Sequence, residues 1–103
     1  MFKLKPNPTF WAKVDLSVPG EPEPEQIEVQ FRHKSIPEIN DYFARLPGRT
    51  DADALGEIIA GWRGADDQFN DDSLAALLAN YPPSAREIFE AYRRELLESR
   101  RKN

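Results

Sequence analysis

The chain has 103 residues, of which 40% are hydrophobic and 31% charged, and its formal net charge is -4. The length fits one domain, residues 1–103, and the composition is typical of a globular protein rather than a disordered one. The negative charge argues against nucleic acid as the main partner, the absence of a run of 18 apolar residues argues against a membrane span, and the absence of cysteine excludes disulfides and thiol chemistry.

Residues 1–34 predict an extended arm followed by a β-hairpin. From Thr9 to Val18, and again from Gln26 to His33, apolar and polar residues alternate, which is the period of a half-buried strand. Between these strands, residues 19–25 hold three prolines and three glutamates, a composition that favours an exposed loop. The two strands therefore predict an antiparallel hairpin whose apolar face packs on the rest of the chain.

Residues 35–99 predict four short helices separated by proline and glycine, and residues 100–103 follow as a basic tail. Large apolar residues repeat at i, i+3, i+4 and i+7 in the first three helical segments, which places each set on one helical face. A fourth helix is expected from Ala85 to about Ser99. The predicted fold class is α+β and mainly α, with the hairpin packed on the helices. The three apolar sets are Ile39, Tyr42, Phe43 and Leu46; Leu55, Ile58, Ile59 and Trp62; and Leu74, Leu77, Leu78 and Tyr81.

Polar residues ahead of each helical segment predict where the helices begin. In a capping box, a side-chain hydroxyl and a carboxylate three residues later each accept a hydrogen bond from the other's backbone N–H. We expect such boxes at the first and the last helix. The predicted starting residues are Ser35 with Glu38, Thr50, Asp71 or Asp72, and Ser84 with Glu87.

No catalytic or metal-binding motif is recognisable, so we expect neither an enzyme nor a cofactor. The run Asp51–Gly56 imitates the start of a calcium loop, but Trp62 stands where the loop requires a glutamate. His33 is the only histidine and has no cysteine partners for a zinc site. The acidic cluster at 66–72 fits a loop and helix cap better than a metal site.

Aromatic and arginine side chains are the candidates for a binding surface, because Trp, Tyr and Arg dominate interface energetics. We take Trp11, Trp62, Tyr92 and Arg93 as candidate partner-binding residues. Core packing is the competing interpretation for Trp62 and Tyr92, since both lie on predicted core faces. Trp11 lies on the polar side of the first strand, where it either covers the strand pair or contacts a partner.

Six segments occur in an order that is typical of one protein family. They are Phe10–Val14, Val29–Lys34, Asp53–Leu55 with Ile58–Trp62, Leu74–Pro82, Phe89–Arg93 and Arg101–Asn103. This pattern resembles the small tail assembly chaperones of long-tailed (siphovirus-type) bacteriophages and prophages, and it covers nearly the whole chain. The resemblance rests on pattern and order rather than on catalytic residues.

The resemblance implies a non-enzymatic protein that binds the long, aggregation-prone tape measure protein in the bacterial host cytoplasm and leaves before the virion is mature. It also implies a minority of longer copies, made by ribosomal frameshifting, whose extension recruits the tail tube protein. Lys102 and Asn103 are the candidate frameshift point, because AAA AAC codons after an Arg101 codon ending in A would complete a slippery heptamer. Coating a long partner favours many copies, so a homo-oligomer is expected.

A small helical adaptor or a nucleic-acid-associated regulatory protein is the alternative. A nucleic-acid role requires a basic stripe on one helix, and only the last helix approaches this, with Arg93 and Arg94 offset by Glu90 and Glu95. Binding that collapses as salt rises would favour this alternative.

Overall fold

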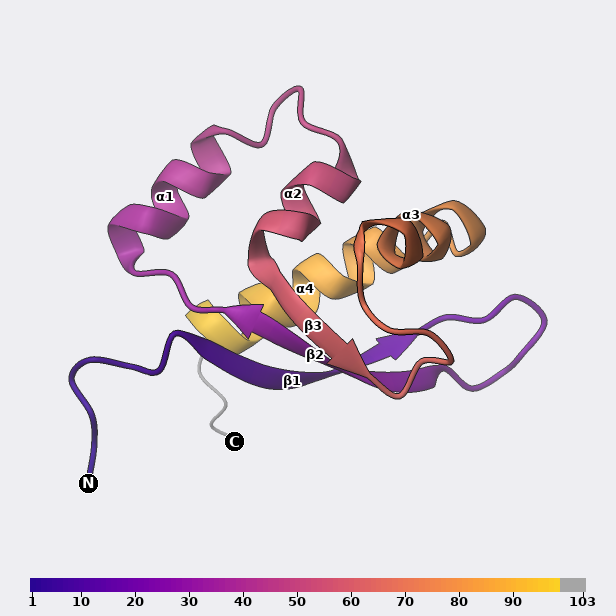
Figure 1. Cartoon of the computed structure of the whole chain (residues 1–103), viewed down its shortest axis with the longest axis horizontal. Helices are drawn as coiled ribbons and strands as arrows, with labels where there is room; N and C mark the ends of the chain where they lie inside the picture. The colour runs from indigo at the N-terminus through magenta and orange to yellow at the C-terminus, as the bar shows by residue number, and fades with distance from the viewer. Residues whose placement is uncertain (99–103) are drawn as a thin grey trace.

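The computed structural model describes residues 1–98, which form a three-stranded antiparallel sheet with four helices on one side of it (Figure 1). The strand order is β1-β2-β3, so β2 is central. The α+β class, with an N-terminal hairpin and four helices after it, is confirmed. The elements in chain order are β1 (Thr9–Leu16), β2 (Glu25–Arg32), α1 (Ile36–Ala44), α2 (Asp51–Ile58), β3 (Ile59–Arg63), α3 (Asp71–Asn80) and α4 (Ser84–Leu97).

Alternation along β1 and β2 decides which face of the hairpin is covered. Ala12 pairs with Val29, and Val14 pairs with Ile27, so apolar residues of both strands point to the same side. All four are buried, whereas Lys13, between the two β1 residues, is exposed, and Glu28, between the two β2 residues, is half-buried. The hairpin is therefore an amphipathic sheet, as predicted from the period of two.

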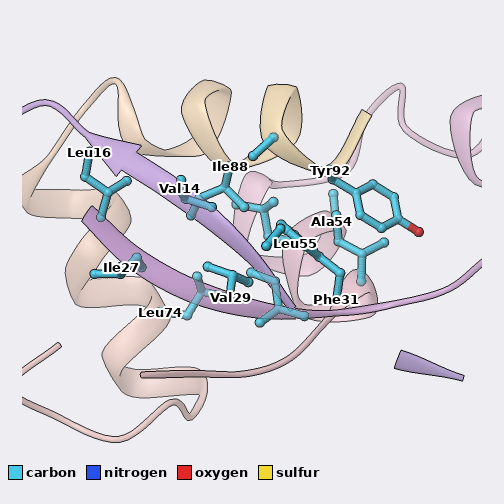
Figure 2. Close-up of a cluster of buried hydrophobic side chains, with 14 of the residues drawn as sticks. Val14, Leu16, Ile27, Val29, Phe31, Ala54, Leu55, Leu74, Ile88 and Tyr92 are labelled. Atoms are coloured by element: carbon cyan, nitrogen blue, oxygen red, sulfur yellow. The ribbon is translucent and has the colours of Figure 1, made fainter. Parts of the chain in front are cut away.

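Helices α4 and α2 cover the apolar face of the sheet. Figure 2 shows Ile88 and Tyr92 of α4 directed at the strands, with Leu55 of α2 in the same cluster. The ring of Tyr92 lies 4.9 Å from that of Phe31, measured between centroids. Aromatic and branched side chains from all three strands and all four helices of the described residues thus form one continuous core.

The second predicted helix is wrong in its C-terminal half. Helix α2 ends at Ile58, and Ile59 begins strand β3, which pairs antiparallel with β2. The register shifts by a bulge between Gln30 and Phe31, so that Ile59 and Trp62 both lie opposite inward-facing residues of β2. Their spacing of three therefore fits a bulged strand as well as a helix, and the open edge of β2 selects the strand.

The first two helix starts are confirmed. Ser35 and Glu38 form the capping box of α1, with the Ser35 N–H donating to Glu38 Oε1 at 2.8 Å. Thr50 caps α2, since its hydroxyl oxygen accepts a hydrogen bond from the Asp53 N–H at 3.1 Å. Both caps are local, which explains why sequence spacing found them.

The other two predicted starts are wrong. Helix α3 is capped by Asn70, not by Asp71 or Asp72, because the Asn70 amide oxygen accepts from Ser73 N–H and Ser73 Oγ accepts in return. Helix α4 has Pro83 at its N-cap position, with no side-chain cap.

The predicted box of Ser84 with Glu87 does not form, because both side chains bind elsewhere. Ser84 is fully buried, and its hydroxyl faces the Leu77 carbonyl at 3.5 Å. The Glu87 carboxylate accepts from the Ser17 N–H at 3.1 Å, which ties α4 to the end of β1. A tertiary contact has displaced the local cap.

Candidate functional site

Trp11 lies on the outer face of the sheet, away from the helices. Its side chain remains 40% exposed, and the Arg63 guanidinium lies over its ring at 4.0 Å from the centroid. Arg63 also donates to Glu28 at 3.0 Å, and this hydrogen bond lowers the pKa of the Glu28 carboxyl. The outer face therefore presents an aromatic ring held by a cation–π contact and an ion pair.

Trp62 points to the opposite, inner side of the sheet and is partly buried. Its indole N–H donates to the Asp67 carbonyl at 2.8 Å, and its ring meets Phe69 edge-on at 5.1 Å. These contacts fix the loop between β3 and α3. Trp62 is thus a packing residue, and its remaining exposed surface lines the groove described below.

Tyr92 is a core residue and Arg93 a surface residue. Tyr92 is 2% exposed, and its hydroxyl donates to the Arg32 carbonyl at 2.8 Å. Burial raises the pKa of the Tyr92 hydroxyl. Arg93 is exposed and pairs with Glu98 at 3.0 Å. The four candidate residues therefore lie in four different environments and do not form one site.

The candidate frameshift point, Lys102 and Asn103, and the basic tail at 100–103 lie outside the described residues.

A groove of about 580 Å³ lies between the hairpin tip, the loop after β3 and helix α3. We call it the acidic groove, because Glu25, Asp66 and Asp67 line it and no lysine or arginine of the described residues does. Its apolar lining comes from Leu16, Val18, Ile27, Trp62, Leu77 and Tyr81.

Sequence reasoning missed the acidic groove because it assigned Leu77 and Tyr81 to the core. In the structure both side chains are only partly buried. Tyr81 is the C-cap residue of α3 and lies just outside the helix. The signal that could have found the groove is the acidic cluster at 66–72, which directly precedes this apolar set. Acidic residues next to a partly exposed apolar stripe are typical of the polar rim around an apolar binding surface.

A second hollow, of about 450 Å³, lies where the N-terminal arm passes the end of α4 and the start of α1. Lys3, His33 and Lys34 line it, together with Phe2, Leu4, Ile36 and Leu97. Those four apolar side chains are also strongly exposed. This end of the molecule therefore combines apolar surface with positive charge.

Glu57 is the centre of an ion-pair cluster. Its carboxylate accepts hydrogen bonds from Arg45 at 2.9 Å and from Arg49 at 2.8 Å, and Lys34 lies 2.9 Å away. These cations hold the pKa of Glu57 well below its usual range, Arg45 having the largest effect. The same three cations surround the ring of Tyr42, whose hydroxyl donates to the Ala54 carbonyl at 2.6 Å. Burial raises the pKa of Tyr42 to about 12.

The Glu57 cluster connects α2 to α1 and to both loops that flank α1. Since each cation already faces a carboxylate, its geometry suits a structural clamp rather than a binding site.

Within residues 1–98, no group of three His, Asp or Glu side chains is arranged to hold a metal ion. None of the helices in that part of the chain has the length and apolar character that crossing a bilayer requires.

The described residues form a small α+β fold with three distinct surface features: the outer sheet face around Trp11, the acidic groove, and the apolar, positively charged hollow beside the N-terminal arm. The family model for phage tail assembly chaperones matches the chain over residues 1–103. The chain therefore belongs to the phage tail assembly chaperone family. A search of the curated proteins and a search of the solved structures gave no significant match.

Proposed function

We propose that the protein binds the tape measure protein in the bacterial host cytoplasm, keeps it soluble during tail assembly, and does so without catalysis. The observation that carries this proposal is the match to the tail assembly chaperone family along the whole chain. The tape measure is the long, helical and aggregation-prone component of such tails, so it is the partner that most needs a chaperone. The proposal includes departure before the virion is mature.

The outer face of the sheet around Trp11 is the proposed contact with the tape measure. Trp11 and Arg63 are of the residue types that most often dominate binding energy, and Trp11 is 40% exposed. The cation–π contact orders both side chains before a partner arrives, which lowers the entropy lost on binding. Trp62 and Tyr92 are instead used in packing.

Co-expression with the tape measure protein of the same phage tests the proposal. The tape measure should stay soluble and co-purify with the wild-type chain, and Trp11→Ala should greatly reduce its recovery. Phe43→Ala is the matched control, because Phe43 is an aromatic side chain with the same 40% exposure on α1. A tape measure that stays insoluble with the wild-type chain would contradict the proposed function. Equal recovery with the Trp11 and Phe43 variants would contradict the proposed contact surface.

Salt separates this function from a nucleic-acid-associated role. Binding that depends on an aromatic contact should persist from about 0.1 to about 1 M salt, whereas nucleic-acid binding weakens steeply over that range. Complete loss of co-purification in high salt would favour the alternative.

The proposal also includes self-association and a longer, frameshifted form that contacts the tail tube protein. Many weakly bound copies along one long partner would gain avidity. Expression from the native DNA with an N-terminal tag tests the longer form, since slippage near Lys102 and Asn103 should give a faint larger band. A single band would exclude it.

A further inference from the structure

We propose that the N-terminal arm, residues 1–8, of one copy docks into the acidic groove of a second copy. The inference adds a surface to the self-association proposed above. It does not depend on tape measure binding, because every test uses the purified chain alone.

The acidic groove offers apolar contacts beside uncompensated negative charge. Leu16, Ile27 and Leu77 contribute apolar side chains, while Glu25 and Asp67 contribute carboxylates, and none of the described lysines or arginines lines it. An occupant that matches this surface has apolar side chains with cations next to them. A purely apolar occupant would leave the carboxylates facing it without partners.

The arm has this chemistry. Phe2 is 87% exposed and Leu4 is 92% exposed, although both are large apolar side chains. They alternate with Lys3 and Lys5, so an extended backbone places the two apolar side chains on one side and the two cations on the other. In the free chain Lys3 donates to Asn7 at 2.6 Å, a local contact that docking can replace.

The arm and the acidic groove lie at opposite ends of the molecule. Figure 1 shows the arm leaving the sheet at the left, while the hairpin tip and α3 lie at the right. From Thr9 to Leu16 the strand covers about 23 Å at about 3.3 Å per residue, and the chain from Thr9 back to Phe2 spans at most about 25 Å. Reaching its own groove would require the arm to reverse direction and stretch fully along β1, so a second copy is the favoured acceptor.

Docking of one end onto the opposite end of the next copy is a heterologous contact. Such contacts give closed rings when the rotation between copies closes, and open chains when it does not. Repeated copies would present their Trp11 faces in series, which suits a long partner.

Sedimentation velocity of the purified chain over a range of concentrations tests the proposal. The wild type should associate reversibly, and the double variant Phe2→Ser, Leu4→Ser should associate at least about tenfold more weakly, because it loses two apolar anchors. The double variant should keep its fold, since both side chains are exposed and the Pro8 carbonyl still accepts from the His33 N–H.

Ala76 and Ala75 provide a matched pair on the acceptor side. Both are exposed on α3, but only Ala76 lines the groove. Ala76→Arg adds bulk and positive charge against the incoming lysines and should weaken association at least about tenfold, while Ala75→Arg, with the same helix propensity and charge, should change it little.

A labelled synthetic peptide of residues 1–9 supplies the arm in trans. It should bind the Phe2→Ser, Leu4→Ser protein, bind the Ala76→Arg protein at least about tenfold more weakly, and lose affinity as salt rises. A wild type that stays monomeric at all concentrations would overturn both self-association and this surface. Association that neither variant weakens would overturn only the surface.

Discussion

Replacing Glu57 with glutamine should destabilise the fold strongly, although the substitution changes only one side-chain oxygen to an NH2 group. The carboxylate is 24% exposed and accepts from Arg45, Arg49 and Lys34. In Glu57→Gln the amide oxygen can still accept one or two of these hydrogen bonds, but the charge is lost. Three cations then remain close together around the Tyr42 ring, with no carboxylate between them.

The cost follows from the burial of this cluster. Exposed ion pairs contribute about 0.2–1 kcal/mol each, and charge-assisted hydrogen bonds in partly buried positions contribute more. For three pairs on one carboxylate we expect a loss of about 1–3 kcal/mol in the free energy of unfolding. In a domain of this size that lowers Tm by roughly 4–20 °C.

Thermal unfolding followed by circular dichroism measures this shift. Asp41→Asn is the control, because Asp41 is 67% exposed and, among the described residues, pairs with a single cation, Arg45, so the loss of its charge should cost less than about 0.5 kcal/mol. If Glu57→Gln melts within about 2 °C of the wild type, or no lower than Asp41→Asn, the cluster does not stabilise the fold.

The pH dependence of this stabilisation has a definite sign. The pKa of Glu57 is lower in the folded chain than in the unfolded one, so the unfolded chain binds the proton more readily. The contribution of Glu57 is therefore fully present above the unfolded pKa, about 4.3, and is lost as pH falls below it. The stability difference between wild type and Glu57→Gln should be constant near neutral pH and shrink from about pH 5 to about pH 2. A difference that grows in acid would contradict the assignment.

Four further substitutions test the packing, each by chemical denaturation. Ile58→Ala should cost about 2–5 kcal/mol because the side chain is fully buried, whereas Leu77→Ala should cost clearly less because it lines a groove; equal losses would place Leu77 in the core. Tyr92→Phe should cost about 1 kcal/mol through the lost hydrogen bond to the Arg32 carbonyl, and an unchanged stability would make that bond irrelevant. Gly56→Ala should stabilise by about 0.5–1 kcal/mol, since Gly56 is inside α2 with open space around its Cα; destabilisation would show that the site is crowded.

Most of the secondary structure could be predicted from the sequence because its signals are local. Alternation set the faces of β1 and β2, and the capping residues Ser35 and Thr50 set the starts of α1 and α2. The end of α2 could not be predicted in this way. Ile59 and Trp62 fit a helical period and a bulged strand equally well, and only the free edge of β2 decides between the two.

The surface features, like the secondary structure, were predictable from the sequence only where their signals are local. The sequence indicated that Trp11 lies on the polar side of its strand, because the period of a strand is fixed, and it showed an arm in which lysines alternate with large apolar residues. It could not show which stripe residues would stay partly uncovered.

By itself, then, the sequence determined the fold class, the hairpin and the family pattern, since these depend on period, caps and order along the chain. Only the tertiary structure decided that Tyr92 is buried against Phe31, that Glu57 gathers cations from three segments, and that α3 leaves the acidic groove open. Each of these depends on residues that are distant in sequence and become neighbours only when the sheet and helices pack.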